Sequence, residues 1–353
     1  MSNPISMPQN ERASLASTSV EKFHTVLKSS TRIFTLCGAG LSVASGLDTF
    51  RGAGGIWRSY RSTALATPEA FERDPGLVRL FYAYRRHKAL QAKPNIGHHA
   101  LAELTKSLGE KAFICLTQNI DGLSQRANHP REQLKLLHSS LFDIKCASCP
   151  YYEPDNFNDP VHPSLLVDED SVTARLSAAA KSTPKDNSTS PDGASNSPTI
   201  PLVDLPHCPS CKTGLLRPAV VWFGEALPED TLDEIDQWID KEPIDLCLVI
   251  GTTATVYPAA SYVHVAQAAG ARVAVINMDS KDLGSTGTLR KKDFLFEGDA
   301  ARILPDILRP VVGGLEAFAG LGKTMEGRKE TTGNSNLQEG FEDEDEEMNE
   351  VQK

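Results

Sequence analysis

The sequence predicts an α/β fold, in which a parallel β-sheet carries helices and a small metal-binding module is inserted. Two observations indicate this class. Short apolar, β-branched runs that fit buried strands alternate along the chain with helical patterns, and such alternation is typical of parallel sheets. Two Cys-x-x-Cys pairs, which begin at Cys146 and Cys208, lie between the two halves of that alternation. Four cysteines at this spacing are typical of a tetrahedral metal site.

The strands and helices can be placed in order from these patterns. Buried strands are expected at residues 32–37, 112–116, 246–250 and 272–276, because these short runs are rich in β-branched and other apolar side chains. Helical segments are expected between them, at residues 42–45, 68–71, 76–92, 96–108, 228–241 and 258–269.

Three stretches lack this patterning. Residues 1–18 are polar, residues 151–206 are rich in Pro, Ser, Asn and Asp, and residues 324–353 end in the acidic run Glu342–Glu347. Segments that bury little apolar surface stay disordered, so we expect a disordered N-terminus, a disordered insertion and a solvated tail. Much of the net charge of −10 lies in the insertion and the tail, so the rest of the chain is less acidic than the total suggests.

The composition places the protein in a broad class. Its 353 residues are 40% hydrophobic, which suffices for a core, and no apolar run reaches the length that spans a bilayer. The 7 cysteines are an odd number, which disfavours a secreted disulfide framework, and no signal peptide is visible. We therefore expect an intracellular protein without membrane association, in the cytoplasm, nucleus or mitochondrion. The acidic balance disfavours direct nucleic-acid binding.

A glycine-rich turn follows the first predicted strand, in the segment Cys37-Gly-Ala-Gly-Leu-Ser42. Gly38 and Gly40 allow a pyrophosphate to approach backbone N–H groups at a helix start. The motif departs from the dehydrogenase fingerprint Gly-x-Gly-x-x-Gly and is common after strands, so an ordinary surface loop stays open as an alternative. The loop that follows carries two aromatic side chains and an arginine, which is typical of a flap over a cofactor. These residues are Phe50, Trp57 and Arg51.

Polar side chains follow three of the predicted strands, at the edge where ligands of open parallel sheets bind. After the second strand, Thr117-Gln-Asn-Ile-Asp121 offers amide and carboxylate groups for a ribose or an amide, although an Asx turn is the alternative. After the third and fourth strands, Gly251–Val256 and Asn277–Asp279 offer hydroxyl and amide groups that fit phosphate and ribose contacts.

Two further segments have both a structural and a functional interpretation. His138 is flanked by apolar residues, as structural histidines often are, but an unperturbed pKa of about 6.5 also suits a general base. The apolar segment Arg217–Glu225 fits either a core strand or an edge that pairs with a peptide strand.

The cysteine pairs are the most specific motif. Cys146-Ala-Ser-Cys149 and Cys208-Pro-Ser-Cys211 supply four thiolates, which leave no coordination position open for catalysis, so the expected zinc is structural. The long gap between the pairs is tolerable because loop-closure entropy grows only logarithmically with length. Buried cysteines or redox pairs are the alternatives. The remaining Cys37, Cys115 and Cys247 lie in predicted strands and are interpreted as core residues.

Taken together and in this order, the segments resemble the sirtuin family of NAD-dependent protein lysine deacylases. The resemblance covers residues 20–310 apart from the insertion, and it includes Gly-Ala-Gly-x-Ser, Phe-Arg-Gly, Thr-Gln-Asn-Ile-Asp, Leu-His-x-Ser, two cysteine pairs, Gly-Thr-Thr and Asn-x-Asp. It implies a Rossmann-like NAD-binding domain, residues 19–142 and 217–312, with a small zinc module at 143–216. Residues 313–353 then form a C-terminal extension.

The segments Ala53–Trp57, Leu65–Pro68 and Phe81–Arg86 look like the class III branch of the family, which removes succinyl, malonyl and glutaryl groups from lysine. Residue spacing supports this independently, because Tyr82 and Arg85 share a face of a predicted helix. A guanidinium pairs bidentately with a carboxylate, and a phenol adds one hydrogen bond. Periodicity by itself favours an exposed face of an amphipathic helix.

The resemblance implies a mechanism in which NAD is consumed as a co-substrate. Asn119 and Asp121 hold the nicotinamide and its ribose while the glycosidic bond ionises, and the acyl oxygen attacks the ribose. His138 then accepts a proton from a ribose hydroxyl. The products are free lysine, nicotinamide and O-acyl-ADP-ribose. The implied partners are acylated-lysine proteins or peptides, and the protein is expected to be a monomer.

The resemblance also assigns binding residues. The implied NAD contacts come from the glycine turn, the flap, the polar segments and a helix start, and are Gly38, Ala39, Gly40, Ser42, Phe50, Arg51, Trp57, Gln118, Asn119, Ile120, Asp121, Gly251, Thr252, Thr253, Asn277, Met278, Asp279 and Ala300. The implied substrate contacts are Tyr82, Arg85, Val221, Trp222, Phe223 and Gly224.

Three residues depart from the family pattern without removing a catalytic group. Asp48 stands where proline is usual, Ser139 where glycine is usual, and Thr253 where serine is commoner. If position 139 needs a positive φ, serine is strained there. Three alternatives to the class III activity stay open, namely a deacetylase without acidic-acyl preference, a mono-ADP-ribosyltransferase, and a non-catalytic binder.

Overall fold

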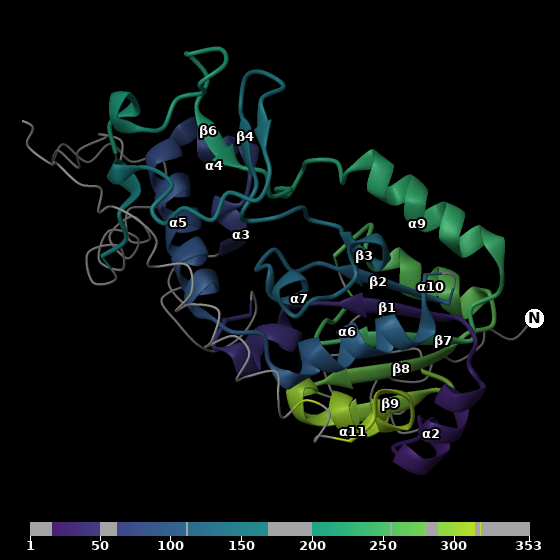
Figure 1. Cartoon of the computed structure of the whole chain (residues 1–353). Helices are drawn as coiled ribbons and strands as arrows, with labels where there is room; N and C mark the ends of the chain where they lie inside the picture. Colours follow the sequence, from purple (N-terminus) through teal and green to yellow (C-terminus); the bar gives the residue numbers. More distant parts are fainter. Residues whose placement is uncertain are drawn as a thin grey trace, which may run out of the picture. The chain divides into compact units, whose positions relative to one another are not determined.

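Six parallel strands form the central sheet, in the order β3–β2–β1–β7–β8–β9 (Figure 1). The computed structural model describes residues 16–49, 62–110, 112–168, 200–254, 256–279, 289–314 and 318. In the middle of the sheet, β1 (Ile33–Cys37), β2 (Phe113–Thr117) and β7 (Leu246–Ile250) are buried along their whole length. Continuous apolar runs suit a parallel sheet that is covered on both faces, and the predicted α/β class is confirmed.

The outer strands continue the sheet on both sides. β8 (Arg272–Asn277) and β9 (Phe294–Glu297) follow β7, and β3 (Leu134–Leu136) lies beyond β2. The sequence predicted β1, β2, β7 and β8 to within one residue. It missed β3 and β9, because such short edge strands show no periodicity.

Helices cover both faces of this sheet (Figure 1). On one face, α11 (Ala300–Val312) packs against α6 (Ile96–Leu108) and α2 (Val20–Ser29). On the other face, α9 (Glu229–Lys241) and α10 (Ser261–Ala268) share an apolar core with the strands. The sequence predicted α6, α9 and α10 to within three residues and missed α2 and α11. Within the described ranges, none of the helices combines the length and the apolar character needed to cross a membrane.

Side chains at helix starts explain several boundaries. Asn95 caps α6 by accepting hydrogen bonds from backbone N–H groups of its first turn. Asp74 caps α5 (Pro75–Gln91) in the same way, through the backbone N–H of Leu77 at 2.9 Å. α5 was predicted at 76–92. It is preceded by α3 (Ser62–Leu65) and α4 (Pro68–Arg73).

A second sheet belongs to the region of the cysteine pairs. Its three antiparallel strands lie in the order β5–β4–β6, with β4 at Ile144–Cys146, β5 at Tyr152–Glu153 and β6 at Leu216–Pro218. This small module follows β3 along the chain and precedes α9.

The sequence predicts disorder across 151–206, and the structure differs at both ends of this segment. Besides β5, it contains 3₁₀ turns at Pro163–Leu165 and Leu202–Asp204. Buried Leu165 and Leu205 pack with Ala83 of α5, so a few widely spaced apolar side chains order these ends without any periodic pattern. Residues 169–199 lie outside the described residues, and the domain limits stay a prediction.

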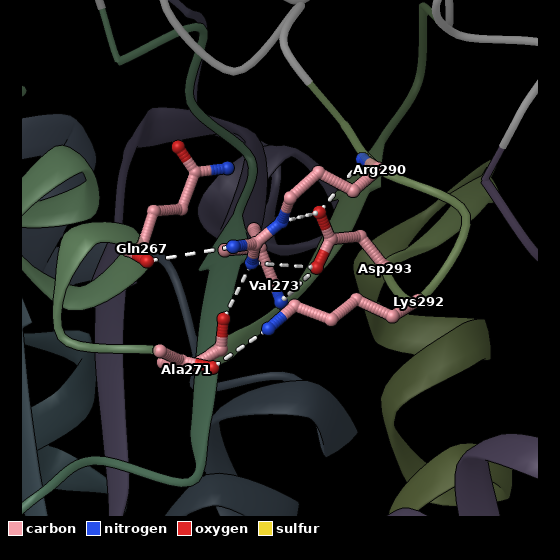
Figure 2. Close-up of polar contacts among 7 residues, drawn as sticks. Gln267, Ala271, Val273, Arg290, Lys292 and Asp293 are labelled. Atoms are coloured by element: carbon pink, nitrogen blue, oxygen red, sulfur yellow. Dashed lines mark hydrogen bonds and ion pairs between the residues drawn. The ribbon is translucent and has the colours of Figure 1, made fainter.

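An ion pair with a fully buried carboxylate lies at the amino ends of β8 and β9 (Figure 2). Asp293 is 0% exposed, and its carboxylate accepts hydrogen bonds from the Arg290 guanidinium at 2.8 and 3.0 Å and from the Val273 backbone N–H at 2.9 Å. The same guanidinium donates to the Ala271 carbonyl at 2.5 Å. The pair therefore fastens the residues before β9 to the start of β8.

Candidate active site

The carboxyl ends of β1 and β7 form the point where the strand order reverses, because the chain builds outward from β1 to β3 and later from β7 to β9. The Gly38 N–H donates to the Ile250 carbonyl, and the Gly40 N–H donates to the Gly251 carbonyl, both at 2.9 Å. A Cβ at Gly38 would lie 2.6 Å from Thr252 Cβ, and one at Gly40 would lie 2.5 Å from Gly251 Cα. Both glycines are therefore required by the close approach of the two loops.

The loops after β1 and β2 are joined through polar side chains. After β1 the chain forms the 3₁₀ helix η1 (Ala39–Ser45), where the sequence predicted a helix at 42–45. Ser42 Oγ donates to an Asp121 carboxylate oxygen at 2.7 Å. Asn119 Nδ2 donates to the Gly38 carbonyl at 3.0 Å and to Ser42 Oγ at 3.3 Å. The structure thus brings together four residues that the sequence assigned to NAD.

The Asp121 carboxyl is held from two sides. Its second oxygen accepts the Leu123 backbone N–H at 2.9 Å. Burial raises the pKa of Asp121, and the hydrogen bonds from Leu123 and Ser42, together with the charges of Arg126 and Arg85, oppose that effect. A carboxylate placed in this way can accept hydrogen bonds from a hydroxyl-rich ligand.

Gln118 has a donor that the protein does not use. Its Oε1 accepts the Thr252 hydroxyl at 2.9 Å, whereas its buried Nε2 has no hydrogen-bond partner among the described residues. Buried polar atoms are nearly always hydrogen-bonded, so this amide is available to a ligand. A glycine-rich strand edge with a spare amide donor fits a nucleotide that carries ribose and amide groups.

His138 follows β3 and lies beside the same segment. Its Nδ1 is 2.9 Å from the Gln118 carbonyl, which can only accept, so Nδ1 carries the proton and Nε2 keeps a lone pair. Burial lowers the pKa of His138, and the hydrogen bond to Gln118 opposes this. The ring is therefore neutral at pH 7 and can accept a proton. The next residue, Ser139, has a positive φ of 58°, and a serine is strained in this conformation.

Tyr82 and Arg85 lie on α5, as predicted. Tyr82 is 2% exposed, its ring stacks on Trp222 with centroids 6.2 Å apart, and its hydroxyl has no hydrogen-bond partner within the described ranges. Burial raises the pKa of Tyr82 to about 12, so the phenol keeps its proton. The Arg85 guanidinium carbon is 6.0 Å from the centre of the Tyr82 ring. Burial lowers the pKa of Arg85, and Tyr82 and Asp121 oppose this.

The segment Val221–Gly224 adjoins the histidine without forming a regular strand. The Val221 N–H donates to the His138 carbonyl at 3.1 Å, and the Phe223 N–H donates to the Ala66 carbonyl at 2.9 Å. These two N–H groups are already used, so a peptide would have to pair with other groups of this segment.

A salt bridge that sequence reasoning missed holds this segment in place. Arg217 donates to both carboxylate oxygens of Glu225, at 2.6 and 2.8 Å, and Glu225 also accepts the Trp222 N–H at 2.9 Å. The Arg217 guanidinium lies over the Trp222 ring at 3.2 Å. The opposite charges that flank an apolar segment were the available sequence signal.

The remaining predicted NAD contacts are spread along the sheet edge. Ile120 is buried, Thr253 follows Thr252, and Ala300 is buried in the first turn of α11. The Asn277 carbonyl accepts the Gly298 N–H at 2.8 Å. Met278 is 57% exposed, and Asp279 is also exposed. The flap residues Phe50, Arg51 and Trp57 lie outside the described residues.

The four cysteines of the small module converge. The Sγ atoms of Cys146, Cys149, Cys208 and Cys211 all lie within 4.8 Å of one another, and the 146–211 and 149–208 pairs are 3.7 and 3.6 Å apart. These distances are too long for disulfides and close to the edge of about 3.8 Å that four Zn–S bonds of about 2.3 Å produce in a tetrahedron. Backbone N–H groups of Ser148, Ser210 and Gly214 donate to the sulfurs. The cluster therefore fits structural zinc.

The Sir2 family profile matches residues 38–258, which is more than half of the chain. The chain belongs to the Sir2 family. This confirms the family predicted from the motifs, and the parallel Rossmann-like sheet with its four-cysteine cluster confirms the predicted fold class.

Similar proteins and structures agree with this assignment. A protein of Candida albicans named NAD-dependent protein deacylase is 44% identical over 305 residues, which cover 83% of this chain and 98% of the relative. The dog protein named NAD-dependent protein deacylase sirtuin-5, mitochondrial, is 37% identical over 297 residues, or 83% of this chain and 86% of the relative. A crystal structure of a Sir2 homologue–NAD complex has a TM-score of 0.63 and 32% identity, covering 84% of this chain and 95% of the other.

Proposed function

We propose that this Sir2-family chain is an NAD-dependent protein lysine deacylase that prefers acyl groups ending in a carboxylate, namely succinyl, malonyl and glutaryl. The names of its relatives support the deacylase activity. The observation that carries the acyl preference is the buried Tyr82 hydroxyl without a partner, on the helix face that also bears Arg85. A carboxylate can accept hydrogen bonds from both groups.

Each residue of the site has a proposed role. When bound, NAD supplies the ADP-ribosyl group to which the acyl group is transferred. Asn119 and Asp121 orient the ribose and the nicotinamide, and Gln118 donates its unused amide hydrogen. His138 Nε2 accepts a proton from a hydroxyl of the bound co-substrate. The carbonyls of Val221–Gly224 align the substrate peptide.

An acyl panel on one peptide tests the preference. Acetyl, malonyl, succinyl and glutaryl forms are incubated with NAD, and the free-lysine product is measured for the native chain and for Arg85→Met. We expect the variant to lose about 100-fold in desuccinylation and only a few-fold in deacetylation, because a charge-assisted contact is worth about 1.5–3 kcal/mol. Arg73→Met, at an exposed position, removes the same charge and is the control. Equal losses for both acyl groups would reject the preference and leave the deacylase activity standing.

Labelled NAD separates deacylation from mono-ADP-ribosyl transfer, the alternative that uses the same site. Label recovered on small O-acyl-ADP-ribose supports the proposal, and label that stays covalently on protein supports transfer. A deacetylase without acidic-acyl preference would turn over the acetyl peptide best.

The zinc role, the partners and the assembly complete the proposal. Chelation of zinc is expected to unfold the small module rather than to remove a nucleophile. Acylated-lysine proteins or peptides are the proposed partners of a monomer without nucleic-acid or membrane binding.

A further inference from the structure

Helix α5 buries an arginine for which the described residues provide no counter-charge. Arg79 is 3% exposed, its Nε has no hydrogen-bond partner, and no ion pair joins its guanidinium to a described residue. The charge that acts on it comes from Arg86, which is also 3% exposed. Burial and Arg86 lower the pKa of Arg79 to about 9, so its guanidinium is still charged at neutral pH. A buried unpaired cation is costly, which indicates a missing anion.

Arg86 does not supply that anion and is itself held by neutral groups. Its Nε donates to the Asn158 carbonyl at 2.8 Å, and one terminal nitrogen donates to the Leu141 carbonyl at 3.0 Å. The other terminal nitrogen donates to the carbonyl and the side-chain oxygen of Asn156. A guanidinium has five N–H donors, so Arg86 can make one further hydrogen bond.

More distant carboxylates act on Arg86 only. Asp159, Glu153 and Asp143 raise the pKa of Arg86 against the effect of its burial, whereas none of them contributes to the pKa of Arg79. The two buried arginines therefore differ, and the uncompensated charge lies at Arg79.

A small cavity of about 20 Å³ adjoins both arginines. Arg79, Tyr82 and Arg86 form its polar lining from one face of α5, and the remaining lining is apolar, from α5, Leu141 and small-module residues such as Leu165 and Pro218. A cavity of about 10–15 Å³ holds one water molecule, so this cavity has room for a single small molecule or ion.

We propose that this cavity binds a small monatomic anion, with chloride as the abundant occupant, held by N–H donors of Arg79 and Arg86. Water fits the space but leaves the charge uncompensated, and phosphate or a free carboxylic acid has too many heavy atoms for it. The anion compensates the charge that α5 buries against the apolar residues of the small module. Binding of the anion does not depend on catalytic activity, so it is tested by measuring the stability of the folded chain.

Thermal unfolding of the full chain in chloride and in gluconate, at equal ionic strength, tests this site. A ligand that binds only the folded state stabilises it by mass action, so we expect a Tm higher by about 3 °C in chloride, because gluconate is too large for the cavity. Equal Tm values in the two salts overturn the proposal.

Two variants show whether the effect belongs to Arg79. Arg79→Met keeps the length of the side chain and removes the charge, and it is expected to abolish the difference between the salts. Arg131→Met removes the charge of an exposed arginine, 78% exposed and paired with Asp155, and is expected to preserve the difference. A chloride effect that persists in Arg79→Met overturns the proposal.

Diffraction from crystals grown in bromide tests the native chain directly, even if Arg79→Met does not fold. An anomalous peak within hydrogen-bond distance of the Arg79 guanidinium supports the proposal. An empty cavity, an ordered water, or a carboxylate of this chain at that position overturns it.

Discussion

The two ends of the central sheet use similar polar residues in different ways. At the amino ends, Asp293 is bound by Arg290 and by a backbone N–H, and Asp245 accepts the backbone N–H groups of Thr31 and Arg32 at 2.7 and 3.0 Å. At the carboxyl ends, Gln118 has a buried amide donor without a partner among the described residues.

Two residues with a strained backbone also lie at the carboxyl ends. Ser139 and Ala254, with φ of 58° and 47°, both lie in loops after the carboxyl ends of strands. A carboxylate with hydrogen-bond partners contributes to the stability of the fold. A donor without a partner or a strained residue lowers that stability, and such features persist at sites where a ligand binds. We infer that the satisfied carboxylates at the amino end stabilise the fold, whereas the spare donor and the strained residues at the carboxyl end serve ligand binding. Gln267, whose buried Nε2 also lacks a partner among the described residues, is an exception at the amino end.

The largest effect is expected at the carboxyl end, for His138→Ala. Loss of a general base removes about 10³-fold in the rate of acyl removal from lysine, measured at saturating NAD and peptide. The urea midpoint should change little, because the ring makes a single hydrogen bond in the structure. Activity close to that of the native chain would exclude His138 as the base and favour a non-catalytic or different role.

At the amino end, Asp293→Asn is expected to act on stability. Asparagine keeps the shape but loses the charge that accepts the Arg290 hydrogen bonds, and Arg290 is 35% exposed, so we expect a loss of about 2 kcal/mol in the free energy of unfolding, measured by urea denaturation. The kcat of the folded fraction should stay unchanged. Asp306→Asn removes a carboxylate from an exposed pair with Arg309 and should cost less than about 1 kcal/mol. A change of kcat in Asp293→Asn would contradict the division of roles between the two ends.

Gln118 and Gln267 can be compared directly, because each has a buried side-chain amide nitrogen without a partner among the described residues. Gln118→Leu is expected to raise the KM for NAD about tenfold, because one hydrogen bond to the ligand is lost. Gln267, at the amino end, also has a buried Nε2 without a partner in the described part of the chain (Figure 2). Gln267→Leu should leave that KM unchanged, and equal effects of the two variants would show that position at the sheet edge does not matter.

Ser139→Gly relieves strain beside the histidine. Glycine adopts a positive φ without steric cost, so we expect a gain of about 1 kcal/mol in the free energy of unfolding. Asn128, with φ 60°, is the control, because asparagine tolerates this conformation and Asn128→Gly should gain less. Destabilisation by Ser139→Gly would mean that the serine makes a compensating contact.

The smallest effect is a shift in pH dependence. Because burial lowers the pKa of His138, the neutral base persists below pH 6.5, and kcat/KM should fall only as the pH drops through that lowered value. A pH profile of deacylation measures this. An acid limb above pH 6.5 would indicate that the bound co-substrate or another group sets the titration.

Much of the fold and of the sheet-edge site could be predicted, because both follow from local sequence patterns, namely strand and helix periods and short motifs at strand ends. Residues at strand ends, such as Gly38, Asn119 and Asp121, must meet at one edge once the strands are known to be parallel. Edge strands and the ordered ends of 151–206 could not be predicted, because their few apolar side chains become meaningful only against α5. The salt bridge of Glu225 was missed, because folding rather than a sequence pattern brings Arg217 to its carboxylate.

Strand and helix periods and short motifs act over a few residues. They were therefore enough to predict the α/β class, the family, the cysteine cluster and the polar residues that meet at the carboxyl edge of the sheet. Only the tertiary structure decided which groups are satisfied. It paired Asp293 with Arg290, and it left Gln118, Tyr82 and Arg79 with donors that no described residue accepts. Burial and hydrogen-bond partnership depend on neighbours from distant segments, so no local pattern encodes them.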